Sequence, residues 1–161
     1  MLRVLYHIVL AILLAMPLSA AEKLPAYDEL ADAHRDAAAA VAQAHRENKL
    51  VLLVFGANWC PDCRAFEEEM NAPDLGSALA LHYVVVKIDV ARFQKNLDVA
   101  SKYGLAVRRG IPAVSIVSGE DKVLTVADGR KMEELRGNGR PALIKFFDAA
   151  VNAQQNAMTT H

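Results

Sequence analysis

Residues 50–63 read LVLLVFGANWCPDC, an apolar run followed closely by two cysteines. The first six residues, Leu50 to Phe55, have the length and composition of a strand that is buried on both faces of a sheet. Gly56-Ala57-Asn58 interrupts the run, and strong helix formers continue from Arg64 to Met70. The sequence therefore predicts that the cysteines lie at the junction between a strand and a helix.

Cys60 and Cys63 are the only cysteines in the 161 residues. Structural disulfides of exported proteins usually join residues far apart in the chain and close long loops. A disulfide across two intervening residues closes almost no loop and so adds little stability. This spacing indicates that the pair functions in reversible thiol–disulfide exchange. We expect the Cys60–Cys63 dithiol or disulfide to be the redox group, and we expect no other cofactor.

The position of each cysteine relative to the predicted helix indicates its role. An unperturbed thiol is mostly protonated at neutral pH, whereas the thiolate is the nucleophile. Unpaired amides and the positive dipole end at a helix N-terminus favour the thiolate, so Cys60 is expected to attack a substrate disulfide. Cys63, one turn inside, is expected to be more buried and to resolve the resulting mixed disulfide.

The two residues between the cysteines are also informative. Pro61 suits the first helical turn, because its missing amide would have no partner there. Asp62 can accept hydrogen bonds from amides of this turn, but its negative charge near the sulfurs opposes thiolate formation. This favours a reductase over a strong oxidant.

Hydrophobic periodicity elsewhere describes a single α/β domain, with a central mixed sheet flanked by helices. Strands are expected over 83–89, 113–117 and 123–126, the last two as a hairpin, and helices over 75–81, 93–103 and from Pro141 onward. Asp74 is the expected N-cap of the first of these helices, and Gly104 the expected left-handed cap of the second. An extra N-terminal helix is expected to present an apolar face made of Tyr27, Leu30, Ala31, His34, Ala38, Val41 and Ala44.

The beginning of the chain predicts an export signal. A positively charged start precedes the apolar run Val4 to Met16, and small residues follow up to Ala21. A bilayer-spanning helix needs about 20 apolar residues, more than this run supplies. We expect a signal peptide over 1–21, cleaved near Ala21, and a periplasmic location; an uncleaved anchor is the alternative. The domain is expected over 22–155, with a flexible tail over 156–161.

Charge and composition restrict the class of partner. The chain has 18 Lys and Arg against 19 Asp and Glu, and 53% of its residues are apolar. These values are typical of a globular protein and give no reason to expect a polyanionic partner. We therefore expect no binding to nucleic acid. We also expect a monomer.

Several motifs together resemble the thioredoxin family: the buried strand ending in Trp59-Cys60-Pro61-Asp62-Cys63, then Lys87-Ile88-Asp89, then Arg109-Gly110-Ile111-Pro112. The resemblance covers most of the mature chain and implies a thioredoxin-like fold with thiol:disulfide oxidoreductase activity. It also implies that the Ile111–Pro112 bond is cis, with the Ile111 backbone beside the cysteines and available to pair with an extended substrate. The alternative is a trans proline that opens an edge strand.

The sequence departs from the family at Val54, six positions before the first cysteine, where a buried Asp is common. Proton transfer to or from Cys63 is therefore assigned to Glu67, one helical turn on, or to water. For Glu67 the alternative is a solvated helix face. Trp59 is expected to cover the site, against an ordinary role in the core, and Lys87 is expected to be structural.

The expected substrate is a disulfide-containing protein or a small thiol. A membrane or soluble thiol is the expected electron donor, because an exported compartment otherwise holds the pair oxidised. Oxidase or isomerase activity is a further alternative, which would differ from a reductase only in the reduction potential of the cysteine pair. From a different class, the alternative is a thioredoxin-fold binding module or copper-handling protein, for which the candidate further ligands are His34, His45 and His82.

Overall fold

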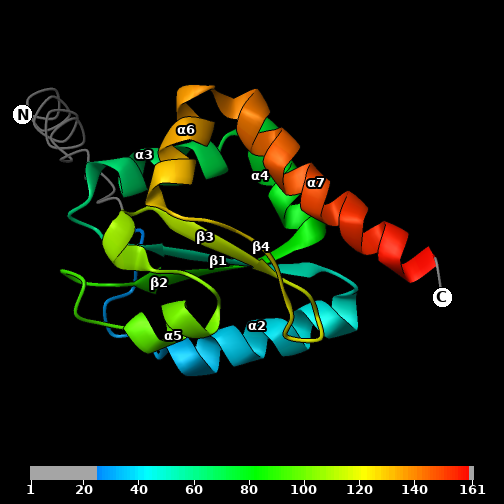
Figure 1. The fold of residues 1–161 in the computed structure, drawn as a ribbon, viewed down its shortest axis with the longest axis horizontal. Coiled ribbons are helices and arrows are strands. Elements are labelled where there is room, and N and C mark those ends of the chain that lie inside the picture. The colour runs from blue at the N-terminus through cyan, green and yellow to red at the C-terminus, as the bar shows by residue number, and fades with distance from the viewer. Residues whose placement is uncertain (1–24, 160–161) are drawn as a thin grey trace, which may run out of the picture.

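The computed structural model describes residues 25–159, so the predicted signal peptide and its cleavage site lie outside the described residues. Its centre is a four-stranded mixed sheet in the order β2-β1-β3-β4. Strand β1 (Leu50–Gly56) pairs in parallel with β2 (Tyr83–Asp89) and antiparallel with β3 (Ala113–Val117), which pairs antiparallel with β4 (Val123–Ala127). Helices cover both faces of the sheet (Figure 1). The predicted single α/β domain is confirmed.

Strand β1 is buried along its whole length, and its side chains alternate between two cores. Leu52 and Val54 lie in what we call the cysteine-side core, whereas Leu53 and Phe55 lie in the alanine-side core. The cysteine-side core is made with α3 (Pro61–Met70), α4 (Pro73–His82), α6 (Gly129–Gly137) and α7 (Arg140–Thr159), and includes Tyr27, Cys60, Cys63, Phe66, Tyr83 and Phe147. The alanine-side core is made with α2 (Ala33–Glu47), α5 (Leu97–Lys102) and the short 3₁₀ helix η1 (Val107–Arg109), and includes Ala33, Ala37, Ala40, Ala44, Ile88 and Tyr103.

Helix α2 confirms the extra N-terminal helix, but it starts later than predicted and buries a different face. Asp32 is its N-cap, and the Asp32 carboxylate accepts a hydrogen bond from the Arg35 amide at 3.1 Å. Tyr27 and Leu30 precede the helix; Leu30 is 94% exposed. Of the predicted apolar face, Ala44 is buried and Val41 packs against the alanine-side core, and the rest of the prediction for this helix was wrong. The buried stripe consists of small residues that allow close packing on β1 and β2: Ala33, Ala37, Ala40 and Ala44.

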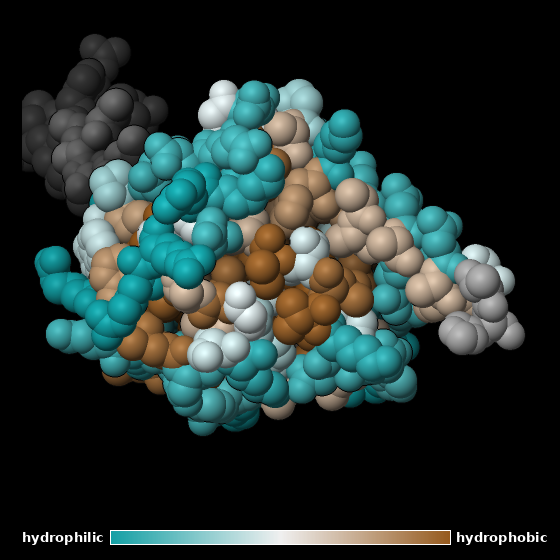
Figure 2. All heavy atoms as spheres, viewed as in Figure 1, coloured by the Kyte–Doolittle hydropathy of each residue, from teal (hydrophilic) through white to brown (hydrophobic). Residues whose placement is uncertain are grey.

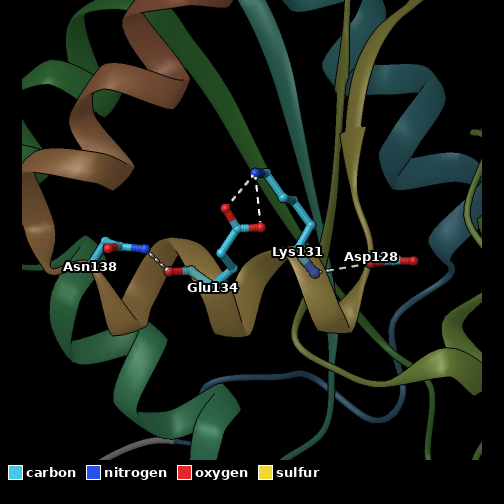
Figure 3. Close-up of polar contacts among 4 residues, drawn as sticks. All are labelled: Asp128, Lys131, Glu134 and Asn138. Atoms are coloured by element: carbon cyan, nitrogen blue, oxygen red, sulfur yellow. Dashed lines mark hydrogen bonds and ion pairs between the residues drawn. The ribbon is translucent and has the colours of Figure 1, made fainter.

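Helix α6 was not predicted. Its local polar contacts explain why it forms (Figure 3): the Asp128 carboxylate accepts a hydrogen bond from the Lys131 amide at 3.0 Å, and Lys131 Nζ pairs with Glu134 Oε1 at 3.0 Å. At the other end, Asn138 donates to the Glu134 carbonyl at 2.8 Å. Met132 and Leu135 are buried under the helix. A capped first turn and two apolar residues at helical spacing are thus enough for this short helix.

Three further helix boundaries differ from the predictions. Helix α4 starts at Pro73 with Ala72 as N-cap, so Asp74 lies in the first turn and pairs with Arg140 at 3.0 Å instead of capping. Helix α5 is shorter than predicted, because Phe93 and the N-cap Asn96 have positive φ angles of 60° and 55°. Helix α7 continues to Thr159 and so includes residues 156–159 of the expected flexible tail. No helix within residues 25–159 is long and apolar enough to cross a membrane.

Strand β4 forms one edge of the sheet and leaves apolar side chains at the surface. Val123, Leu124 and Val126 are 41%, 39% and 38% exposed. Figure 2 shows apolar residues gathered on the face that carries β4 in Figure 1. Within residues 25–159, the apolar side chains of β4 are therefore only partly covered by other side chains.

Candidate active site

Cys60 is the N-cap of α3. Its backbone is extended, and its Sγ accepts a hydrogen bond from the Cys63 amide at 3.2 Å. The same sulfur lies 3.6 Å from the Ile111 carbonyl oxygen, to which the thiol can donate. A cap position places the sulfur at the positive end of the helix, where an anion is favoured. The predicted location of Cys60, just outside the first turn, is confirmed.

Cys63 lies one turn further in and is fully buried. Burial is the main cause that raises the pKa of the Cys63 thiol well above its ordinary value, and the hydrogen bond with Cys60 adds to it. The Ala57 amide and the Tyr27 hydroxyl act in the opposite direction, because they stabilise the thiolate. Both cysteines are free thiols. Cys63 is thus the more buried of the two cysteines, as the sequence predicted, and its raised pKa keeps the thiol protonated.

The first turn of α3 contains Pro61 at its predicted place and Asp62 at the surface. Arg136 of α6 lies with Nη1 3.3 Å from Asp62 Oδ1 and Nε 3.5 Å from Glu69 Oε2. The guanidinium therefore offsets part of the negative charge that Asp62 brings toward the sulfurs. The sequence did not predict the role of Arg136. Its contact with Asp62 joins residues 74 positions apart, and no local sequence pattern indicates such a contact.

The loop after η1 brings the Ile111 backbone to the cysteines. The Ile111–Pro112 bond is cis, as the resemblance implied. Gly110 has a φ angle of 130° and packs against Gly129 at the start of α6; a Cβ on Gly129 would lie 2.3 Å from the Gly110 carbonyl carbon. Only glycine permits this approach, so the first residue of α6 supports the loop that faces Cys60.

Trp59 lies at the surface beside the site, so the alternative of an ordinary core residue is wrong. The residue is 43% exposed, and its Nε1 donates a hydrogen bond to the Ala91 carbonyl at 2.8 Å. Phe93 contacts the ring edge-on with centroids 5.9 Å apart, and the Arg92 guanidinium lies 5.5 Å from the ring centroid. These contacts hold Trp59 against the loop that follows β2.

Glu67 does not lie on a solvated helix face. Its side chain is 12% exposed, and its Oε1 accepts hydrogen bonds from Lys87 Nζ at 2.7 Å and Asn71 Nδ2 at 2.9 Å. Its Oε2 is buried and has no hydrogen-bond partner among residues 25–159. A cavity of about 510 Å³ adjoins this carboxylate and is lined by Pro25, Ala26, Asn58, Arg64, Glu67, Glu68 and Lys87. Lys87, predicted to be structural, is the ion-pair partner of Glu67.

Two of the three histidines named as possible metal ligands lie beside carboxylates, and the third, His82, is the last residue of α4. His34 Nε2 is 2.8 Å from Asp98 Oδ2, and His45 Nδ1 is 3.9 Å from Glu120 Oε1. In the part of the chain that the structure describes, no three His, Cys, Asp or Glu side chains converge as a metal site. The geometry around Cys60 and Cys63 is that of thiol exchange.

Comparison with known proteins agrees with this geometry. Residues 32–119, more than half of the chain, match the family model described as Thioredoxin-like. The crystal structure of a disulphide isomerase from Xylella fastidiosa Temecula1 is 37% identical, over 81% of this chain and 99% of that one, with a TM-score of 0.74. No curated protein matches the chain. The chain belongs to the thioredoxin-like family, and within it the protein is a thiol:disulfide oxidoreductase.

More distant structures share the fold alone. The oxidised DsbD C-terminal domain of Neisseria meningitidis is 21% identical over 74% of this chain and 97% of that one, with a TM-score of 0.52. A DsbH oxidoreductase is 17% identical over 85% of this chain and 94% of that one, with a TM-score of 0.51. Both comparisons span most of each chain and support the same fold.

Proposed function

We propose that the protein is an exported reductase that exchanges the Cys60–Cys63 dithiol with disulfides of proteins or small thiols. The observation that carries this proposal is the pairing of an N-cap thiol with a second thiol behind it. Cys60 Sγ accepts a hydrogen bond from the Cys63 amide at 3.2 Å, and Cys60 is 5% exposed whereas Cys63 is 0% exposed. A substrate disulfide reaches Cys60 first, and Cys63 acts only after a bond to Cys60 has formed.

The exchange has two steps. The Cys60 thiolate attacks one sulfur of the substrate disulfide, which forms a mixed disulfide and releases the other substrate sulfur as a thiolate that takes up a proton. Cys63 then loses its proton and attacks Cys60 Sγ, which releases the second substrate thiolate. The substrate gains two electrons, and the protein is left with a Cys60–Cys63 disulfide.

The residues around the pair have supporting roles in this proposal. The Ile111 backbone, held beside Cys60 by the loop that contains Pro112, pairs with an extended substrate strand. Trp59 covers one flank of the site, and Pro61 makes the first turn of α3 rigid. Glu67 accepts the proton that Cys63 loses, and Lys87 pairs with its carboxylate at 2.7 Å.

Export and electron supply belong to the same proposal. The signal sequence predicted over 1–21 would deliver the domain to the periplasm, where oxidising conditions hold a dithiol oxidised unless a donor reduces it. We infer that a membrane or soluble thiol donor regenerates the dithiol. Isomerase activity is the second candidate, because the relative at 37% identity is a disulphide isomerase.

The reduction potential of the pair tests the direction of exchange. Purified mature protein is equilibrated with glutathione or dithiothreitol buffers, and the free thiols are counted after alkylation. A value near −270 mV supports a reductase, about −180 mV supports an isomerase, and about −120 mV makes the protein an oxidant. Recovery of activity from scrambled ribonuclease checks the isomerase outcome directly. If no reversible disulfide forms, the enzymatic proposal is wrong.

A further inference from the structure

A cavity of about 320 Å³ lies next to the loop that faces Cys60. One wall is made of residues 109–112, and the other comes from α6, which covers the same face of the sheet as α3 (Figure 1). Ile111 lines this cavity, and its carbonyl oxygen is 3.6 Å from Cys60 Sγ. A substrate group that is bonded close to the attacked sulfur can therefore enter the cavity.

The charged side chains that line this cavity are only partly paired with one another. Arg136 is paired with Asp62 at 3.3 Å. Arg109 and Arg130 are exposed, and within residues 25–159 neither guanidinium has a hydrogen-bond or ion-pair partner. Glu133 also lines the cavity and has no ion pair within these residues. The cavity therefore has two unpaired positive charges against one unpaired negative charge.

The start of α6 adds to the positive potential of the cavity. The N-cap Asp128 accepts a hydrogen bond from the Lys131 amide, and the first turn that follows contains Arg130 and Lys131 but no acidic residue. A cation near a helix N-terminus is unfavourable for the helix alone, because it opposes the helix dipole. Lys131 is paired with Glu134 at 3.0 Å, whereas Arg130 is unpaired. An anion in the cavity would offset the unfavourable placement of Arg130.

We propose that Arg109 and Arg130 bind a carboxylate close to the disulfide of the substrate, and so select acidic substrates for exchange at Cys60. The inference rests on the proposed function, because it names the class of disulfide that the same site takes. Arginine suits this role, since its planar guanidinium donates paired hydrogen bonds to a carboxylate. A small disulfide can carry such a carboxylate, and so can an acidic residue beside a cysteine in an extended peptide that pairs with the Ile111 backbone.

The two arginines act on substrate binding and leave the sulfur chemistry unchanged. The Cys60–Cys63 dithiol gives up two electrons and two protons and becomes a disulfide. The substrate disulfide takes them up and leaves as two thiols, and its carboxylate is the same before and after the exchange. The expected effect of the arginines is therefore a faster reaction with acidic disulfides than with neutral disulfides of the same skeleton.

Two disulfides of one skeleton test this selectivity: dithiodipropionate, and its dimethyl ester, which lacks the charges. The reduced mature protein is mixed with each compound, and the remaining thiols are alkylated and counted over time. The ratio of the two rates is divided by the same ratio measured with dithiothreitol, a neutral dithiol, to remove the intrinsic reactivity of the compounds. We expect the wild type to prefer the diacid at least about fivefold, and the preference to shrink as the salt concentration rises.

A double variant, Arg109→Gln with Arg130→Gln, removes both unpaired positive charges of the cavity. We expect its preference for the diacid to fall to within about twofold of the dithiothreitol ratio, while its rate with the ester changes less than about twofold. The matched control is Arg108→Gln with Lys122→Gln, because these two exposed cations do not line the cavity and their loss changes the net charge equally. We expect the control to keep the preference of the wild type.

A second pair of substrates identifies the source of the carboxylate. Two disulfide-linked peptides are compared, one with Glu and one with Gln beside the cysteine. If the wild type prefers the Glu peptide and the double variant does not, the cavity takes an acidic side chain of a protein substrate. If the wild type prefers only the small diacid, the cavity takes the carboxylate of a small disulfide.

Different outcomes separate the carboxylate site from the proposed function. If the wild type reduces these disulfides but prefers neither the diacid nor the Glu peptide, the carboxylate site is wrong and the exchange function stands. An equal loss of preference in the control variant also overturns the site, because net charge rather than the cavity would then select the substrate. If none of the disulfides oxidises the reduced wild type, the proposed exchange fails and the carboxylate site fails with it.

Discussion

The two cores on either side of β1 bury different kinds of atom. The alanine-side core contains mainly hydrocarbon, with a stripe of four alanines from α2 facing Leu53, Phe55 and Ile88. The cysteine-side core contains two thiols and the hydroxyls of Tyr27 and Tyr83. Both use alternate residues of the same strand, so one apolar stretch of sequence supports two interiors of different chemistry.

This difference indicates that one core mainly stabilises the fold, whereas the other supports thiol exchange. Apolar packing on the alanine side stabilises the sheet, and the hydroxyl of its tyrosine, Tyr103, has a partner in Asp121 at 3.0 Å. The cysteine side accepts a protonated thiol and unpaired oxygens, which are costly in an interior, at the place where chemistry occurs. Changes on one side should therefore affect stability, and changes on the other should affect exchange.

The largest expected effect is that of Cys60→Ser on exchange. Serine is a good N-cap, so α3 should keep its start while the nucleophilic thiolate is lost. We expect no measurable reduction of a disulfide substrate and a urea midpoint close to that of the reduced wild type. Retained turnover would show that Cys63 can act as the nucleophile despite its burial.

Phe55→Ala should have a large effect on stability alone. Phe55 is fully buried in the alanine-side core, and removing such a ring lowers the free energy of unfolding by about 3–5 kcal/mol. Urea denaturation measures the loss, and the exchange rate per folded molecule should stay unchanged. Phe66→Ala, its counterpart in the cysteine-side core, should lose similar stability and also alter exchange. If both variants change exchange equally, the division between the cores is wrong.

The reduced protein should lose stability in alkaline solution. Burial raises the pKa of Cys63, so the folded protein keeps this proton while the unfolded chain releases it above about pH 8.5. The buried, protonated Cys63 therefore makes its full contribution to the free energy of unfolding below that pH. As the pH rises the free energy of unfolding declines, by about 1–2 kcal/mol at pH 10. Urea midpoints at pH 7 and pH 10 measure it. The oxidised protein lacks the free thiol and should decline less; an equal decline would assign the effect to other groups.

The smallest expected effect is that of Asp62→Asn on Cys60 reactivity. The carboxylate is 72% exposed and pairs with Arg136, so removing its charge should speed alkylation of Cys60 at pH 7 by no more than about two- to threefold. Arg136→Gln should slow alkylation by a similar factor, because the Asp62 charge would then be less offset. Changes in the same direction in both variants would contradict this electrostatic account.

The sequence alone determined the features that depend on neighbours along the chain. An apolar run followed by a proline in the first turn specifies the strand, the helix start and the order of the two sulfurs, because strand burial and helix capping are local. The Ile111–Pro112 motif likewise implied, by resemblance, the loop that faces Cys60, and the structure agrees. Helix α6 was missed because its short apolar pattern gives a weak local signal.

Only the tertiary structure decided which distant side chains surround the sulfurs. Arg136 reaches Asp62 across 74 positions, and Asn58 clamps Tyr27 across 31. Tyr27 fits the helical spacing of residues 27–44, yet it lies outside α2 and in the opposite core. The spacing of apolar residues predicts one helix or strand at a time. These contacts depend instead on how the segment before α2 and helix α6 pack against α3 and the loop that precedes it.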